Sequence, residues 1–263
     1  MTPALSTYRL IDSHIHVGQF NNIYFSPTDI IKLMTDVGVG YYAVSSTTSC
    51  EEDFEKVLHE IEELEWNDAE RVLPIMWITP ESLKGNIAWL LESTIKWRCL
   101  KIHPFLHKEE WRPDGNLFNE VLDIARELKI PLLIHTGNEE CCQIGIYENA
   151  VTTNEGIIFI FAHGRPTEQA IPITQKHNNA YVDSAFMPVN DMKKFIDAEL
   201  SHKLLWGTDM CIPKYFYPEE DMVEYYRKKL EAFKSICNES QFKEVTRLNA
   251  IKLFHIETNQ SQL

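Results

Sequence analysis

Two histidines and an aspartate alternate near the start of the chain, in the stretch LIDSHIHVGQ at residues 10–19. Residues two apart in a β-strand share one face, so a strand here would turn Asp12, His14 and His16 to the same side. Neutral imidazoles and carboxylates are ligands of divalent metal ions such as zinc. The other ligands of such a site must come from elements that the rest of the chain places beside this strand.

Short apolar or alternating segments recur along the chain, separated by amphipathic segments at helical spacing. The strand candidates are residues 8–16, 41–47, 71–79, 99–104, 131–137, 157–164, 180–185 and 204–210. Strict alternation of strands and helices predicts parallel pairing with right-handed crossovers, and eight units in roughly 250 residues match a (β/α)₈ barrel. A doubly wound open sheet is the alternative, but the first turn, HIHVGQF, lacks its glycine-rich fingerprint. We therefore predict an α/β fold, a (β/α)₈ TIM barrel, with residues 1–263 as a single domain.

Periodic apolar residues predict the helices between these strands. The stripes cover residues 54–64, 83–91, 117–128 and 192–200. Asp114 is the expected N-cap of the third helix. Two further stripes, which begin at Met222 and Phe242, predict two helices that close the barrel.

Polar side chains fall at the ends of several later strands, where a barrel of this kind places its active site. They are Lys101 and His103 in the fourth strand, His135 in the fifth, His163 in the sixth and Asp209 in the eighth. Buried polar groups without partners are costly, so several imidazoles and a carboxylate in one place need a partner. A divalent metal ion meets that need, and the sequence predicts a metal site at the barrel mouth.

In these residues the chain resembles the metal-dependent amidohydrolase superfamily, and within it the branch that contains aminocarboxymuconate-semialdehyde decarboxylase and predicted TIM-barrel metal-dependent hydrolases. The matching stretches are IDSHIH, LKIHP, LLIHTG, FIFAHG, WGTDM and NAIKLF. They occur in the order of the family and extend from the first strand to the last helix.

The resemblance implies a ligand set for one divalent ion, and zinc is the ion we expect. Its members are His14, His16, His135 and Asp209. Asp209 would also take a proton from a metal-activated water and pass it to the leaving group. Asp12 is expected to orient a ligand or to accept buried hydrogen bonds.

Two further residues decide between one ion and two. In relatives with one ion, His163 matches a residue beside the metal that stabilises developing charge, whereas in relatives with two ions it matches a ligand of the second. Lys101 matches a position at which some two-ion relatives carry a carboxylated lysine. We expect an uncarboxylated lysine and a single ion, and a second ion is the alternative.

Substrate contacts are expected from the cationic and polar residues around the mouth. Lys101 is equally compatible with a clamp for a substrate carboxylate, a carboxylated ligand and an ion-pair partner of a ligating acid. His103 and Arg165 are the other candidates for substrate binding. The vicinal Cys141 and Cys142 follow the fifth strand, and we interpret them as unreactive loop thiols, with a pocket or metal role as the alternative.

The net charge is −14, with 25 Lys and Arg against 39 Asp and Glu. A field of this sign repels polyanions, which argues against nucleic acid and anionic membranes as partners. The longest apolar run, residues 157–162, is far shorter than the ~20 residues of a membrane helix. Residues 1–7 show no secretory signal, and the six cysteines form no disulfide pattern. These features predict a cytoplasmic protein that acts on a small molecule.

We therefore expect a metal-dependent hydrolase that acts on a small amide, lactone or carboxylated compound through a metal-activated water. A decarboxylase is the alternative within the same branch, since the resemblance covers both reactions on one ligand set. A nuclease fits less well, because nuclease-like relatives have glutamate at the position of Lys101. From another class, a catalytically inert metabolite-binding barrel is the alternative, and the complete ligand set argues against it. Homo-oligomers are common in the family, and the sequence leaves the oligomeric state open.

Overall fold

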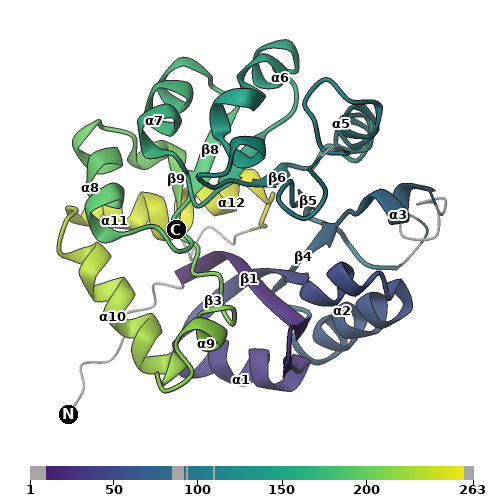
Figure 1. Cartoon of the computed structure of the whole chain (residues 1–263). Coiled ribbons are helices and arrows are strands. Elements are labelled where there is room, and N and C mark those ends of the chain that lie inside the picture. The colour runs from purple at the N-terminus through teal and green to yellow at the C-terminus, as the bar shows by residue number, and fades with distance from the viewer. Residues whose placement is uncertain (1–9, 85–91, 93, 109, 258–263) are drawn as a thin grey trace.

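The computed structural model (Figure 1) describes residues 10–84, 92, 94–108 and 110–257. Its frame is one sheet with the strand order β2-β1-β3-β4-β5-β6-β7-β8-β9, in which every neighbouring pair is parallel except β1 and β2. The strands are β1 (Leu10–Phe20), β2 (Ile23–Phe25), β3 (Val39–Ser46), β4 (Val72–Trp77), β5 (Cys99–Ile102), β6 (Leu132–His135), β7 (Phe159–Ala162), β8 (Ala180–Asp183) and β9 (Leu204–Leu205). Each predicted strand segment overlaps one of these strands, and the predicted barrel is confirmed.

The barrel closes between β9 and β1. The N–H of Ser13 donates to the carbonyl of Trp206 at 2.8 Å, and an isolated parallel bridge joins Ile15 to Met210. The last strand is shorter than the predicted segment 204–210, because the N–H of Trp206 donates to the carbonyl of Val245 at 3.0 Å instead of continuing the ladder. The chain after β9 is therefore held against β1 by a few specific bonds.

One strand was not predicted. The chain reverses at Asn21, and β2 returns antiparallel to β1, with Gly18 opposite Phe25. The backbone of Asn21 has φ 50°, a left-handed conformation that asparagine adopts more readily than most residues. This hairpin extends β1 beyond the barrel mouth.

The helices surround the sheet, as Figure 1 shows. They are α1 (Pro27–Asp36), α2 (Phe54–Asp68), α3 (Pro80–Lys84), α5 (Asn116–Leu128), α6 (Glu148–Thr153), α7 (Thr167–Lys176), α8 (Val189–Asp197), α9 (Pro213–Phe216), α10 (Met222–Lys234), α11 (Glu239–Lys243) and α12 (Asn249–Leu253). The predicted stripes fall on α2, α5, α8, α10 and the α11–α12 segment, and most of the stripe at 83–91 lies outside the described residues.

The predicted helix cap at Asp114 is wrong. Helix α5 has Gly115 as its N-cap, without a side-chain cap bond. The carboxylate of Asp114 instead pairs with Arg112 at 3.3 Å, because one residue more of extended chain separates it from the helix. Leu200 lies beyond the end of α8 but is still buried.

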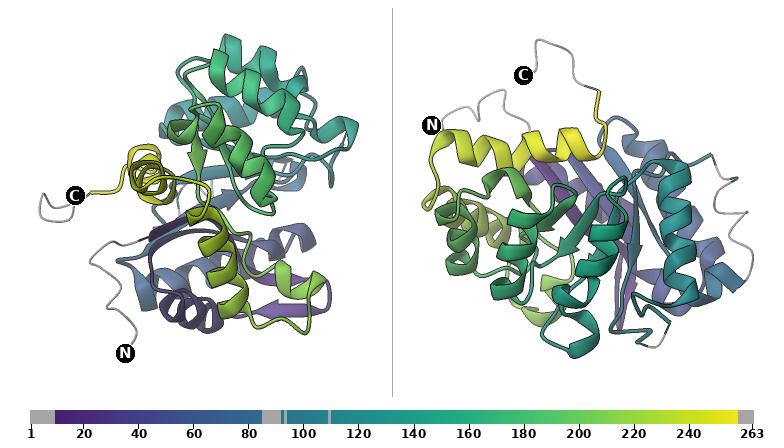
Figure 2. Two further views of the ribbon diagram at one scale, coloured as in Figure 1. Left: turned by 90° about the vertical axis from the view of Figure 1, so that its left-hand side faces the viewer. Right: turned by 90° about the horizontal axis from the view of Figure 1, so that it is seen from above.

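The apolar core has two parts. The larger part lies between the strands and the surrounding helices. The smaller fills the inside of the barrel and includes Ile11, Leu73, Leu133, Ile160, Leu253 and Phe254. The right-hand view of Figure 2 shows the α11–α12 segment lying across the end of the barrel at which β1 starts. Because α12 closes this end, the site must lie at the other end, where the strands finish.

Candidate metal centre

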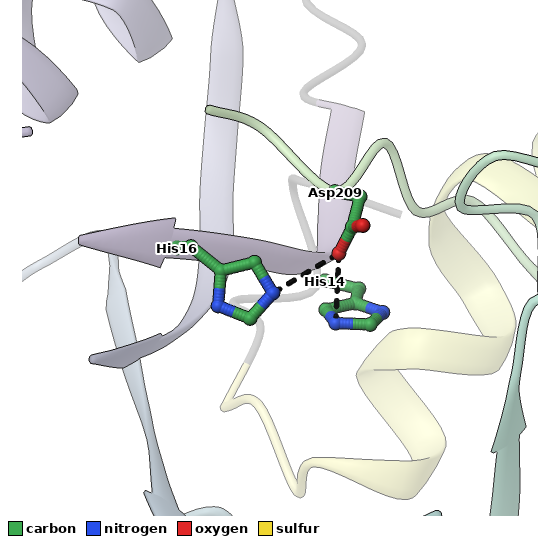
Figure 3. Close-up of side chains that lie close together, drawn as sticks. All are labelled: His14, His16 and Asp209. Atoms are coloured by element: carbon green, nitrogen blue, oxygen red, sulfur yellow. Dashed lines mark hydrogen bonds and ion pairs between the residues drawn. The ribbon is translucent and has the colours of Figure 1, made fainter. Parts of the chain in front are cut away.

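Three of the predicted ligands meet at the barrel mouth (Figure 3). His14 and His16 come from β1, and Asp209 comes from the segment after β9. Asp209 Oδ1 lies 3.1 Å from His14 Nε2 and 3.0 Å from His16 Nε2. All three residues are buried, at 0%, 3% and 6% exposure. Within the described residues, no other group of three or more His, Cys, Asp or Glu side chains brings its ligand atoms this close together.

The backbone holds Asp209 directly against β1. The N–H of Asp209 donates to the carbonyl of His14 at 2.8 Å. Asp209 has φ 63° and His163 has φ 68°, left-handed conformations that are uncommon for residues with a side chain. Such conformations persist only where the surroundings enforce them, and they are frequent at active sites.

Hydrogen bonds on the far side of each imidazole fix its orientation. Asp183 Oδ2 lies 2.9 Å from His14 Nδ1, and the carbonyl of Ser45 lies 3.3 Å from His16 Nδ1. A carboxylate can only accept, so Nδ1 of His14 carries a hydrogen. Nδ1 of His16 also lies 3.1 Å from the hydroxyl of Ser45, and the Nε2 atoms of both rings face Asp209. Metal-ligating histidines are held in this way.

The electrostatics of the cluster favour a neutral His16 ring beside a carboxylate anion. Burial lowers the pKa of His16 to about 3, so its ring is neutral at physiological pH. Burial alone would raise the pKa of Asp209, but the charge interaction with His14 and the hydrogen bond with His16 outweigh it and hold that pKa well below the usual range. Two imidazole nitrogens and an anionic oxygen therefore converge, which is a donor set that zinc prefers.

The amine of Lys101 lies against the same two nitrogens. Its Nζ is 3.0 Å from His14 Nε2 and 3.1 Å from His16 Nε2, and it lies 4.2 Å from the centre of the Trp77 ring. Burial lowers the pKa of Lys101 to about 8, which still leaves an ammonium group at neutral pH. The position between the two histidines thus already accommodates a cation.

His135, the fourth predicted ligand, is not part of the three-residue group. Its ring stacks on His103 with centroids 3.7 Å apart, and its Nδ1 lies 3.1 Å from His163 Nε2. His163 Nδ1 lies 2.8 Å from the carbonyl of Ala185 and must carry the hydrogen of that contact. His163 Nε2 is then an acceptor for the Nδ1–H of His135, so Nε2 of His135 keeps its lone pair.

Three buried polar atoms around the mouth have no hydrogen-bond partner within the described part of the chain. They are Trp77 Nε1, Arg165 Nε and His103 Nδ1. The indole and guanidinium groups are donors only. Unpaired buried donors are costly, and acceptor oxygens of a bound molecule would satisfy them.

The family follows from the sequence as a whole. A family model described as amidohydrolase matches residues 11–256. The chain belongs to the amidohydrolase family. The predicted resemblance and the predicted enzyme class are confirmed at this level. No curated protein sequence is significantly similar to this amidohydrolase.

Solved structures with the same fold cover nearly the whole chain. An amidohydrolase from Burkholderia multivorans with bound zinc has a TM-score of 0.68 at 11% identity, over 95% of this chain and 100% of that chain. A probable 2-pyrone-4,6-dicarboxylic acid hydrolase from Acinetobacter baumannii with bound citric acid has a TM-score of 0.66 at 11% identity, over 94% and 99%. A 5-carboxyvanillate decarboxylase from Novosphingobium aromaticivorans, complexed with manganese and a nitrobenzoic acid, has a TM-score of 0.64 at 10% identity, over 94% and 96%. At these identities the likeness concerns the fold.

Two residues of this amidohydrolase site were not predicted. Asp183 ends β8 and Trp77 ends β4, so their place at strand ends was the signal available in the sequence.

Asp12 is fully buried and accepts hydrogen bonds from the N–H of His14 at 3.2 Å and the hydroxyl of Thr208 at 2.6 Å, which agrees with its predicted role as an acceptor.

The vicinal cysteines of this amidohydrolase lie apart from the three-residue group. Cys141 and Cys142 form part of a short 3₁₀ turn, Glu140–Cys142, and their sulfurs are 3.7 Å apart. Burial raises the pKa of Cys142 to about 12, so its thiol is protonated and a poor ligand.

No helix in the described ranges is long and apolar enough to cross a membrane.

Proposed function

We propose that this amidohydrolase binds one divalent ion, zinc, through His14, His16, Asp209 and His135, and hydrolyses a small organic substrate that carries a carboxylate. One observation carries the proposal: two Nε2 atoms and a carboxylate oxygen converge within 4.8 Å in a buried site, with both Nδ1 atoms already in contact with other partners. The zinc bound to the Burkholderia multivorans structure supports the choice of ion.

A divalent ion in this position supplies Lewis acidity and lowers the pKa of a bound water from 15.7 to about 7. Asp209 has a second carboxylate oxygen, which Figure 3 shows pointing away from both imidazoles. That oxygen is available to hold the proton of the attacking water and to pass it on, as a general base and then a general acid.

The chain of hydrogen bonds from Ala185 through His163 to His135 holds two rings in place beside this position. His163 Nε2 is an acceptor in this arrangement, so a role as donor to a developing oxyanion requires the ring to take up a second proton. Burial lowers the pKa of His163 to about 4, which makes the neutral, accepting form the resting one.

The substrate class is inferred from the donors at the mouth. Lys101 and Arg165 are cationic, and Trp77 Nε1 and Arg165 Nε are buried donors without a partner in the described residues. A carboxylate presents the acceptor oxygens that these groups lack. The Acinetobacter baumannii structure with bound citric acid, a probable dicarboxylic acid hydrolase, is in keeping with this class.

Metal content and activity test the proposal together. We expect about one zinc per chain in the wild type and a substoichiometric amount in a His14→Asn/His16→Asn double variant, with the exposed His202→Asn as the matched control. A screen of lactones, amides and carboxylated aromatics should then give turnover that a chelator abolishes and zinc restores. Full zinc occupancy in the double variant would contradict the proposed metal site. Release of CO₂ without hydrolysis would show that the reaction is a decarboxylation.

A further inference from the structure

A lysine from α10 joins the two chain segments that carry the carboxylates of the metal centre. Figure 1 shows α10 on the outside of the barrel between α8 and α1. Lys229 Nζ donates to the carbonyl of Ser184 at 2.7 Å and to the carbonyl of Gly207 at 3.0 Å. Ser184 directly follows Asp183, and Gly207 is two residues before Asp209. One ammonium group thus bonds to the segments after both β8 and β9.

These two segments are packed directly against His14. A Cβ atom added to Gly207 would lie 3.1 Å from the Cβ of His14 and 3.4 Å from the Cγ of Asp183, so the backbone here has little room to move. The N–H of Gly207 also donates to Ser184 Oγ at 3.0 Å. A shift of either segment would therefore change the contacts that His14 makes with Asp183 and with Asp209.

We propose that Lys229 is a positioning residue of the metal centre, which sets the spacing between Asp183 and Asp209 on the two sides of His14. This inference rests on the proposed metal site. Removal of the ammonium group leaves the Ser184 hydroxyl, which donates to the Gly207 carbonyl at 3.0 Å, as a remaining link between the two segments, and no other positive charge among the described residues bonds to both carbonyls. The spacing of the two segments is then less tightly fixed. His14 then loses the fixed direction of its Nε2 lone pair, and zinc binds more weakly.

The chain contains a matched control for this lysine. Lys203 Nζ also donates to two backbone carbonyls, those of His177 at 3.0 Å and Asn178 at 2.7 Å, and it lies 4.5 Å from the centre of the Tyr181 ring. Burial lowers the pKa of Lys203 and of Lys229 to about 8. Lys203, however, precedes β9, and its partners precede β8, so it lies at the opposite end of the barrel from the metal centre.

The test compares zinc affinity in the wild type, Lys229→Met and Lys203→Met. The zinc dissociation constant is measured at pH 7 by competition with a chelator, and the stability of each metal-free form by urea unfolding. We expect Lys229→Met to raise the dissociation constant about 10- to 100-fold, the usual effect of removing a group that supports metal ligands. Lys203→Met should lower stability to a similar degree and leave the dissociation constant within about twofold of the wild type. The visible spectrum of the cobalt-loaded protein should change in Lys229→Met alone.

The outcomes separate this inference from the proposed function. If the wild type binds zinc tightly and Lys229→Met has the same zinc dissociation constant, the positioning role is refuted and the metal site is not. An equal loss of affinity in both variants also refutes it, since general loosening would then be the cause. A wild type that binds no zinc refutes the metal site itself. Lys229→Gln, which keeps one donor and no charge, is measured in the same way if Lys229→Met does not fold, with the same direction expected.

Discussion

Asp183 accepts the Nδ1–H of His14 at 2.9 Å, across 169 residues of sequence, and both side chains are fully buried. This contact fixes the tautomer of His14 and aims its Nε2 at Asp209. A carboxylate in this place also raises the basicity of the ligating nitrogen. The orientation of the predicted ligand therefore depends on a residue that belongs to another strand.

Replacement of this carboxylate should weaken metal binding. Asp183→Asn keeps the shape but lets an amide face Nδ1, so the tautomer of His14 is no longer enforced. We expect the zinc dissociation constant to rise about 10- to 100-fold, measured by competition with a chelator. Asp197→Asn, at an aspartate that is 60% exposed, is the control. An unchanged constant in Asp183→Asn would show that His14 is oriented by other contacts.

The stability of the metal-free protein should fall as the pH is lowered from 7.5 to 5. Burial lowers the pKa of His16 to about 3 and of His163 to about 4, below the 6.5 of an exposed histidine. The unfolded chain therefore binds more protons than the folded one below pH 6.5, and stability is lost as the pH falls. For His16 alone the loss at pH 5 is about 2 kcal/mol.

One buried carboxylate acts in the opposite direction. Burial raises the pKa of Asp12 to about 6, so this group offsets part of the loss. Burial also lowers the pKa of His103 and His135 well below 6.5, and the four histidines together outweigh Asp12. Urea unfolding with chelator present at both pH values checks the sign, and equal or greater stability at pH 5 would contradict it.

Asp209 and His163 should separate metal binding from turnover. Asp209→Asn should keep much of the zinc, because an amide oxygen can still coordinate, and it should lower kcat by roughly 10²–10⁴-fold, because an amide cannot take the proton of the water. His163→Asn should keep the zinc, because His14, His16 and Asp209 still hold it, and it should lower kcat by a comparable factor, because the acceptor that orients the His135 ring is lost. Metal stoichiometry and kcat are measured on the same preparations. Near-normal turnover in Asp209→Asn would leave Asp209 a ligand only, and loss of an ion in His163→Asn would indicate two ions.

The indole of Trp77 should contribute to substrate binding. Trp77→Phe keeps an aromatic ring beside Lys101 and removes the unpaired N–H, so KM for a carboxylated substrate should rise by about tenfold with little change in kcat. Trp66→Phe is the control, because Trp66 is 89% exposed on α2. The same KM in both variants would show that the indole N–H does not contact the substrate.

The sequence predicted the elements better than the contacts between them. Periodicity is a local property, so the strands and most helices could be located from it. Alternation along β1 also predicted that His14 and His16 share a face. The N-cap of α5 is Gly115 and not Asp114, and the hairpin at Asn21 was not expected. Both features depend on the backbone conformation of one or two residues, which side-chain patterns do not determine.

The orienting residues could not be predicted, because their role depends on register. Asp183 and Trp77 are the last residues of β8 and β4, yet only the curvature of the sheet decides which ligand each one contacts. The same holds for Lys229, whose partners are backbone carbonyls. A lysine on an amphipathic helix that bonds to carbonyls 22 and 45 residues away has no sequence signature.

The most direct measurement is a crystal structure of the zinc-loaded protein with anomalous data collected at the zinc edge. We predict a single ion about 2.0–2.2 Å from Nε2 of His14, Nε2 of His16 and a carboxylate oxygen of Asp209, with His135 as the further ligand and the Lys101 amine displaced from the two histidines. An anomalous peak at the sulfurs of Cys141 and Cys142, or no peak at the histidines, would contradict the proposed centre.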